Sequence, residues 1–192
     1  IQIEPMYRRQ DAPEKLGVSG VPPFTRGTTI REGSMDAWDV RALHEDPDVA
    51  FTKKAVIADL ERGVTSLWLR VGADAIKPED IAGDLKDVLL DLAKVEVSSR
   101  DDQEVAAQAL LDVYAESKID ADKLSFNLGL DPIGFAALNG GTPDLSGMAT
   151  WVKKTENYKN SRPFVVDATI YHNAGAGAVS YTHLRAHETR ED

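Results

Sequence analysis

Polar residues able to contact a substrate follow several of the strands that this sequence predicts. His172 stands with Tyr171 at the end of an apolar run over residues 163–170, and Asp167 lies within that run. A neutral imidazole N–H can stabilise charge on a carbonyl oxygen without forming a full ion pair. His172 is therefore the sharpest candidate for chemistry, and a structural hydrogen bond at the strand end is the competing interpretation.

Other predicted strands also end in polar residues, for which structural interpretations are available. Asp131 precedes Pro132 and is typical of a helix cap, and Asp167 can be paired within the fold. Gly72 and Gly129 suit turns that require positive φ. The remaining candidates at strand ends are His44, Asp74, Ser98, Ser99 and Asn127.

The last residues carry a metal-like spacing that we set aside. His183 and His187 are four residues apart, as in some zinc sites on helices. However, residues 179–189 read VSYTHLRAHET, which matches one translated frame of a sequencing-library adapter. We therefore expect residues 179–192 to be an artefactual tail. The chain begins with Ile1 rather than Met, so we expect a fragment of a longer protein.

Composition narrows the class of protein. The chain has 192 residues, a formal net charge of -10 and no cysteine. An acidic surface disfavours nucleic acid and anionic membranes. Without cysteine, disulfides, thiolate metal sites and thiol catalysis are excluded. No apolar run is long enough for a transmembrane helix, so a cytoplasmic protein is the default expectation.

Strands and helices alternate after a non-periodic start. Residues 1–27 predict an extended arm with turns at Gly20 and at Pro22-Pro23. Residues 28–178 predict a domain of βαβ units around a parallel sheet. The expected strands are residues 37–43, 64–71, 95–97, 124–128 and 163–170. Four helices are expected. The first covers residues 53–62 with Thr52 as its cap, and the second runs from Pro78 to Leu92. The third starts at Asp101 and Asp102, with Val105, Ala109, Leu110 and Val113 buried, and the fourth covers residues 145–155.

Two ways of arranging such a sheet are open at this point. A doubly wound sheet usually carries Gly-x-Gly-x-x-Gly after its first strand, and this sequence has none. A (β/α)8 barrel needs about 250 residues, so five strands would form only part of one.

Four segments resemble the methylmalonyl-CoA mutase family. They are PFTRG (23–27) with Trp38 and Arg41 downstream, GVTSLWLRVG (63–72), LGLDPIG (128–134) and VVDATIYHNAG (165–175). The resemblance implies a partial (β/α)8 TIM barrel. It is greater to the small, non-catalytic subunit of the bacterial heterodimer than to the catalytic subunit.

The catalytic subunit's functional residues are mostly replaced here. Aligned without gaps, its Tyr, Thr, Arg and Tyr positions are Thr29, Arg31, Asp36 and Leu43. Arg41 is kept, and the family's Tyr-His pair matches Tyr171-His172. The resemblance thus leaves Arg41 and His172 as candidate substrate-binding residues, and no catalytic, metal-binding or cofactor-binding residue is expected.

The resemblance implies a role inside a complex. The catalytic subunit interconverts methylmalonyl-CoA and succinyl-CoA with adenosylcobalamin, so that subunit, not this chain, is expected to bind the cofactor. The acyl-CoA substrate is expected in the complex of the two subunits. The arm is a natural candidate for wrapping the partner. The alternatives are a catalytic acyl-CoA mutase with a divergent site and an unrelated barrel enzyme.

Overall fold

The computed structural model describes residues 6, 8, 17–28 and 38–177. The chain divides into two units, Ile1–Trp38 and Asp39–Asp192. Thr29, Arg31, Asp36 and the tail histidines lie outside the described residues. The predicted boundaries of the arm, the barrel domain and the tail stay predictions.

Residues 17–28 of the first unit form consecutive tight turns. The amide of Gly20 donates to the carbonyl of Gly27 at 2.9 Å, and the amide of Phe24 donates to the carbonyl of Val21 at 2.9 Å. Turns are present at Gly20 and at Pro22-Pro23, which confirms the prediction for both places.

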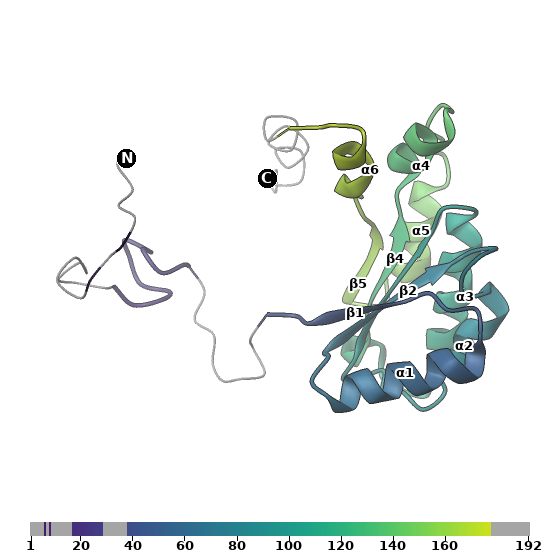
Figure 1. Ribbon diagram of the computed structural model, residues 1–192, viewed down its shortest axis with the longest axis horizontal. Coiled ribbons are helices and arrows are strands. Elements are labelled where there is room, and N and C mark those ends of the chain that lie inside the picture. The colour runs from purple at the N-terminus through teal and green to yellow at the C-terminus, as the bar shows by residue number, and fades with distance from the viewer. Residues whose placement is uncertain (1–5, 7, 9–16, 29–37, 178–192) are drawn as a thin grey trace. The chain divides into compact units, whose positions relative to one another are not determined.

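The second unit is built on one parallel sheet of five strands in sequential order (Figure 1). The strands are β1 (Arg41–His44), β2 (Ser66–Val71), β3 (Lys94–Ser99), β4 (Ser125–Leu130) and β5 (Asn160–Phe164). Alternation in β2 places Leu67, Leu69 and Val71 on the buried face, as predicted. Trp68 and Arg70 point to the opposite face.

Helices follow the strands, and α1, α2 and α3 lie against the buried face (Figure 1). They are α1 (Val49–Glu61), η3 (Pro78–Asp80), α2 (Ile81–Asp84), α3 (Gln103–Glu116), η4 (Ala121–Lys123), α4 (Pro132–Asn139), α5 (Met148–Thr155) and α6 (Ala168–Asn173). The core lies between the sheet and α1 to α3. Within it the Tyr114 ring stacks on Phe126, with 4.4 Å between centroids. None of the described helices combines the length and apolar character needed to cross a membrane.

The first two helices differ from the prediction. Asp48, not Thr52, caps α1 by accepting from the amide of Phe51 at 3.0 Å. Thr52 is buried inside the helix. The helix expected from Pro78 ends at Asp84 and leaves Leu89 and Leu92 exposed. Gly83 lies in this short helix and costs about 1 kcal/mol relative to alanine, which weakens its continuation.

Helix α3 begins as predicted, because Asp102 accepts from the amide of Val105 at 3.0 Å. Its buried face was predicted in part: Leu110 is buried and Ala109 and Val113 are partly buried against the core, but Val105 is not. The side chains against the sheet are Ala106, Ala107, Leu110, Leu111 and Tyr114. The two alanines allow close packing on the strands, so Val105 turns outward and is 47% exposed.

The fifth strand is shorter than predicted. It ends at Phe164, and Asp167 then caps α6 by accepting from the amide of Thr169 at 2.9 Å. Tyr171 and His172 therefore lie on α6 rather than at a strand end. Asp167 is not paired inside a barrel as expected, because its carboxylate serves the helix cap.

Candidate functional site

The sheet face opposite the core carries a row of polar and aromatic side chains. Alternation brings Trp68 and Arg70 from β2, Glu96 and Ser98 from β3, and Leu43 from β1 to this face. At the carboxyl ends of the strands these five residues line a cavity of about 270 Å³. Thr169 and Ile170 of α6 line the same cavity, so α6 bounds one side of it.

Arg41 lies beside this cavity and is held by three groups of its own chain. Its Nε donates to Ser66 Oγ at 3.0 Å and its Nη2 to Asp39 Oδ2 at 3.1 Å. Its Nη1 pairs with Glu96 Oε2. All three nitrogens of the guanidinium are thus engaged inside the fold.

The two carboxylates that hold Arg41 respond differently to their surroundings. Burial raises the pKa of Asp39, but hydrogen bonds from Thr65, Ser66 and Arg41 outweigh it and leave that pKa below its usual value. Burial also raises the pKa of Glu96, and the attraction of Arg41 offsets only part of this effect. The surroundings of Glu96 therefore oppose the ionisation of its carboxyl group.

Two further polar contacts lie in the cavity wall. Trp68 Nε1 donates to Ser98 Oγ at 2.7 Å, and Arg70 Nη2 lies 3.0 Å from Glu45 Oε2. The charge of Arg70 is therefore balanced by a carboxylate of the same chain, and Arg100 is the second arginine of the wall.

Asp131 connects three elements beneath this cavity. Its Oδ1 accepts from the amide of Gly134 at 2.8 Å, which confirms the predicted helix cap. Its Oδ2 accepts from the amide of Asp167 at 2.9 Å, and its own amide donates to Gln103 Oε1 at 2.9 Å. Asp131 is buried and fixes the segment between β5 and α6 against α4.

The two glycines predicted to need positive φ differ. Gly129 has φ 65°, and a Cβ there would meet the carbonyl oxygen of Val97 at 1.8 Å. Gly72 does not have positive φ; a Cβ there would meet Asp101 Oδ2 at 2.6 Å, so close approach of a side chain favours glycine instead.

The two residues predicted to bind substrate are not part of the cavity wall. Arg41 touches the wall through Glu96, whereas His172 is exposed on α6. His44 is buried on the helix side, with Nε2 3.6 Å from Asp59 Oδ2. Burial lowers the pKa of His44, and the charge of Asp59 acts in the opposite direction.

The sequence reasoning missed Glu96. The segment KVEVSS (94–99) alternates as β2 does, and this alternation already places Glu96 on the same face as Trp68. Its pairing with Arg41 could not be predicted, because the two residues are 55 positions apart.

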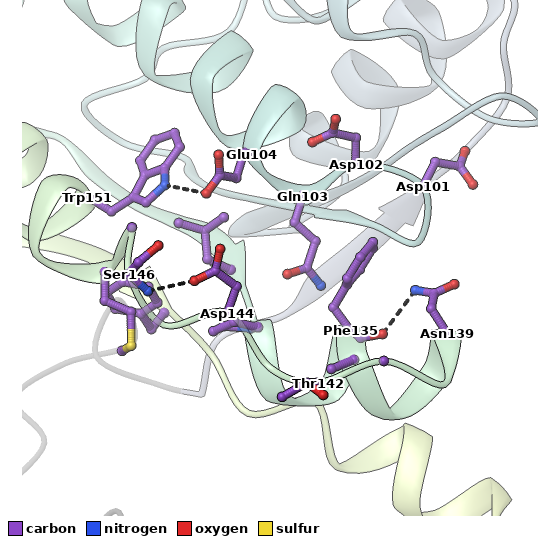
Figure 2. Close-up of a pocket in the computed structure, with 17 residues that line it drawn as sticks. Asp101, Asp102, Gln103, Glu104, Phe135, Asn139, Thr142, Asp144, Ser146 and Trp151 are labelled. Atoms are coloured by element: carbon purple, nitrogen blue, oxygen red, sulfur yellow. Dashed lines mark hydrogen bonds between the residues drawn. The ribbon is translucent and has the colours of Figure 1, made fainter.

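A larger groove of about 610 Å³ lies on the helix side, between α3, α4 and α5 (Figure 2). In it Trp151 Nε1 lies 3.4 Å from Glu104 Oε1, and Asp144 accepts from the amide of Ser146 at 2.9 Å. Figure 2 shows Phe135 and Asn139 on the opposite side, joined by a hydrogen bond within α4.

The described residues do not fit adenosylcobalamin. Pockets for drug-sized ligands are about 300–1,000 Å³, and a corrin is far larger than such ligands. The sheet-face cavity is smaller than this range, and the larger groove is rimmed by carboxylates. His44 is too buried to reach a cobalt ion. Within the described part of the chain, no group of three or more His, Asp or Glu could hold a metal ion.

Comparison with known proteins found clear relatives. The chain is 60% identical over 181 residues to the methylmalonyl-CoA mutase small subunit of Propionibacterium freudenreichii subsp. shermanii, covering 94% of this chain and 28% of that protein. It is 35% identical over 180 residues to the small subunit of Streptomyces virginiae, covering 93% and 29%. A probable methylmalonyl-CoA mutase small subunit of Mycobacterium tuberculosis is 28% identical over 180 residues, covering 93% of this chain and 29% of that protein. No family model matches the chain.

Proposed function

We propose, since this chain belongs to the methylmalonyl-CoA mutase small subunits, that its parent protein is the non-catalytic partner in an adenosylcobalamin-dependent mutase. The chain spans less than a third of the length of its relatives, so the activity and the partner of the whole protein are part of this proposal. The partner would be the catalytic subunit in a cytoplasmic heterodimer. That subunit would bind the acyl-CoA and the cobalamin.

The observation that carries a non-catalytic role is the state of Arg41. A guanidinium that binds a substrate carboxylate or phosphate needs free N–H groups directed at the ligand. In Arg41 each nitrogen already donates one of the five N–H groups within the chain, to Ser66, Glu96 and Asp39, and the charge is balanced by the two carboxylates. Releasing them for substrate would leave a half-buried carboxylate without its partner, which is costly.

The cavity wall supports the same proposal. Leu43 stands where the catalytic subunit carries a tyrosine, and a leucine donates no hydrogen bond. The wall carries three carboxylates, Glu96, Asp131 and Asp167, against two arginines, Arg70 and Arg100, so it offers an anionic acyl-CoA ester no excess of positive charge.

A (β/α)8 barrel is part of this proposal. Five parallel strands in sequential order, with α1, α2 and α3 on one face, are the arrangement of consecutive barrel units. A doubly wound sheet instead reverses its strand order.

One observation favours the alternative, a catalytic mutase with a divergent site. Glu96 is a carboxyl group with a raised pKa in a cavity at the carboxyl ends of parallel strands, which is typical of a functional site. Its pairing with Arg41 explains the same environment structurally.

Two variants test the non-catalytic role in the reconstituted heterodimer. Arg41→Gln and His172→Ala should each leave kcat and KM for methylmalonyl-CoA within a few-fold, because the working site lies in the other subunit. Melting curves are the control for loss of packing. A fall of about 100-fold in kcat/KM with an unchanged melting temperature would assign the residue to chemistry or substrate binding.

A further inference from the structure

Helix α4 ends in the only Asn-Gly pair of the sequence. Asn139 is the last residue of the helix, and Gly140 follows it with φ 71°. Both residues are exposed, and Asn139 lines the groove of about 610 Å³ (Figure 2). Gly140 has no Cβ, so no side chain hinders the approach of its amide nitrogen to the neighbouring asparagine. The pair is therefore suited to a reaction between a side-chain amide and the backbone.

Two hydrogen bonds restrain this pair in the folded helix. Asn139 Nδ2 donates to the carbonyl of Phe135 at 2.9 Å. The amide of Gly140 donates to the carbonyl of Ala136. A ring that joins the Gly140 nitrogen to the side chain of Asn139 can close only after Asn139 leaves helical φ and ψ and both bonds break. Helix ends fray, so opening of the last turn of α4 brings the two groups together.

The end of α6 provides a matched comparison within the same fold. Asn173 is the last residue of α6 and is exposed, as Asn139 is on α4. It is followed by Ala174, whose Cβ hinders the approach of the amide nitrogen. The two asparagines thus share their position and exposure and differ in the residue that follows.

We propose that Asn139 is a site of spontaneous deamidation, at a rate set by opening of the last turn of α4. The Gly140 nitrogen loses its proton and attacks Cγ of Asn139. The bond between these two atoms forms, the bond from Cγ to Nδ2 breaks, and Nδ2 leaves as ammonia with the added proton. Water then opens the cyclic imide at either carbonyl and leaves aspartate or isoaspartate. This inference does not depend on the proposed mutase role.

The product changes the end of α4. A carboxylate at this position faces the negative end of the helix dipole. It also cannot donate a hydrogen bond to the carbonyl of Phe135, as Nδ2 of Asn139 does. Deamidation therefore loosens the last turn of α4 and the edge of the groove that this turn forms.

The test follows deamidation during incubation of the full-length protein at neutral pH. Peptide mapping by mass spectrometry, with separation of aspartate from isoaspartate, gives the rate at each asparagine. A synthetic peptide of residues 132–145 is the unfolded reference, because so short a helix does not form alone. We expect Asn139 to react about 30-fold more slowly in the protein than in the peptide, since two ordinary hydrogen bonds must first break. Asn173 should stay unchanged while Asn139 converts.

Two matched variants test whether α4 sets the rate. Ala137→Gly weakens α4 at an exposed position and should speed the reaction of Asn139 about fivefold, as the helix propensity of glycine implies. Ala115→Gly makes the same change at an exposed position of α3 and should alter the rate less than about twofold.

The outcomes that would overturn the proposal are distinct. Reaction of Asn139 no faster than that of Asn173 would mean that Gly140 confers no reactivity. Equal rates in the protein and in the peptide would mean that the helix does not restrain the pair. Equal acceleration by both glycine variants, or none by Ala137→Gly, would mean that the last turn of α4 does not set the rate.

Discussion

Arg41 illustrates how the environment of a residue decides what its chemistry can be used for. From the sequence it is a cation at a position where the mutase family keeps an arginine. In the fold, Asp39 and Glu96 balance its charge and Ser66 accepts its third hydrogen bond. The residue type is retained, and the contacts make it part of the sheet rather than a free ligand group.

Asp84 is the least satisfied residue of the described chain. It is 1% exposed, and neither carboxylate oxygen has a hydrogen-bond partner. Burial, aided by the charge of Asp80, raises the pKa of Asp84 from 3.8 to about 6. The folded state therefore binds this proton more tightly than the unfolded state does. Asp84 thus destabilises the fold fully above about pH 6, and this cost disappears below about pH 4.

Asp84→Asn should stabilise the protein at neutral and alkaline pH. Removing the charge should raise the free energy of unfolding by about 1–3 kcal/mol at pH 8, because a buried uncompensated group is removed. The gain should shrink to near zero as the pH falls through the range between about 6 and 4. Urea unfolding of Asp84→Asn and of the unchanged protein across this range measures the difference in the free energy of unfolding. The lowered pKa of His44 adds its own pH dependence, which is the same in both proteins and cancels in the difference.

Asp91 is an exposed aspartate, so the same substitution there is the control for the effect of burial. Asp91→Asn should change the free energy of unfolding by less than about 0.5 kcal/mol at every pH. A gain for Asp84→Asn that is absent at pH 8, or that is the same at pH 4, would show that Asp84 is ionised in the fold without cost.

At the scale of elements, prediction succeeded where one physical signal dominated. The alternation in β2 and the caps of α3 and α4 by Asp102 and Asp131 were visible in local sequence. It failed where two signals competed. Residues 163–170 are apolar enough for a strand, but Asp167 is followed by Thr169 and caps a helix instead.

The two apolar faces of α3 show another limit of local sequence. One face carries Val105, Ala109 and Val113, and the other is built around Ala106 and Ala107. Periodicity cannot decide between them, because the close approach of the helix to the strands is a tertiary effect. The candidate site was predictable only as a face carrying Trp68 and Arg70, and its pairing between distant strands was not.

Asp131 and Asp102 offer a matched pair of helix caps. Asp102→Ala removes one cap and should cost about 1 kcal/mol. Asp131→Ala also leaves the part-buried amide of Asp167 without its acceptor, so it should cost about 1 kcal/mol more. Urea unfolding of both variants measures the two costs. Equal costs would mean that the bond from Asp167 to Asp131 contributes nothing to the fold.

At the scale of the whole fold, the unit Asp39–Asp192 combines a sheet face that carries paired polar side chains with helices that cover the opposite, buried face. Of the two described histidines, His44 is buried and His172 is exposed on α6. Arg41 and Arg70 are each paired with a carboxylate of the same chain. This arrangement suits a protein that supports a partner's reaction. The relatives of this chain, named as small subunits, point the same way.

The most direct test of the non-catalytic role is turnover by the full-length protein alone. Purified without its partner and supplied with methylmalonyl-CoA and adenosylcobalamin, it should form no succinyl-CoA above background. Addition of the catalytic subunit should restore conversion, which shows that the preparation is competent. Conversion by the lone subunit at a rate comparable with the complex would contradict the non-catalytic role.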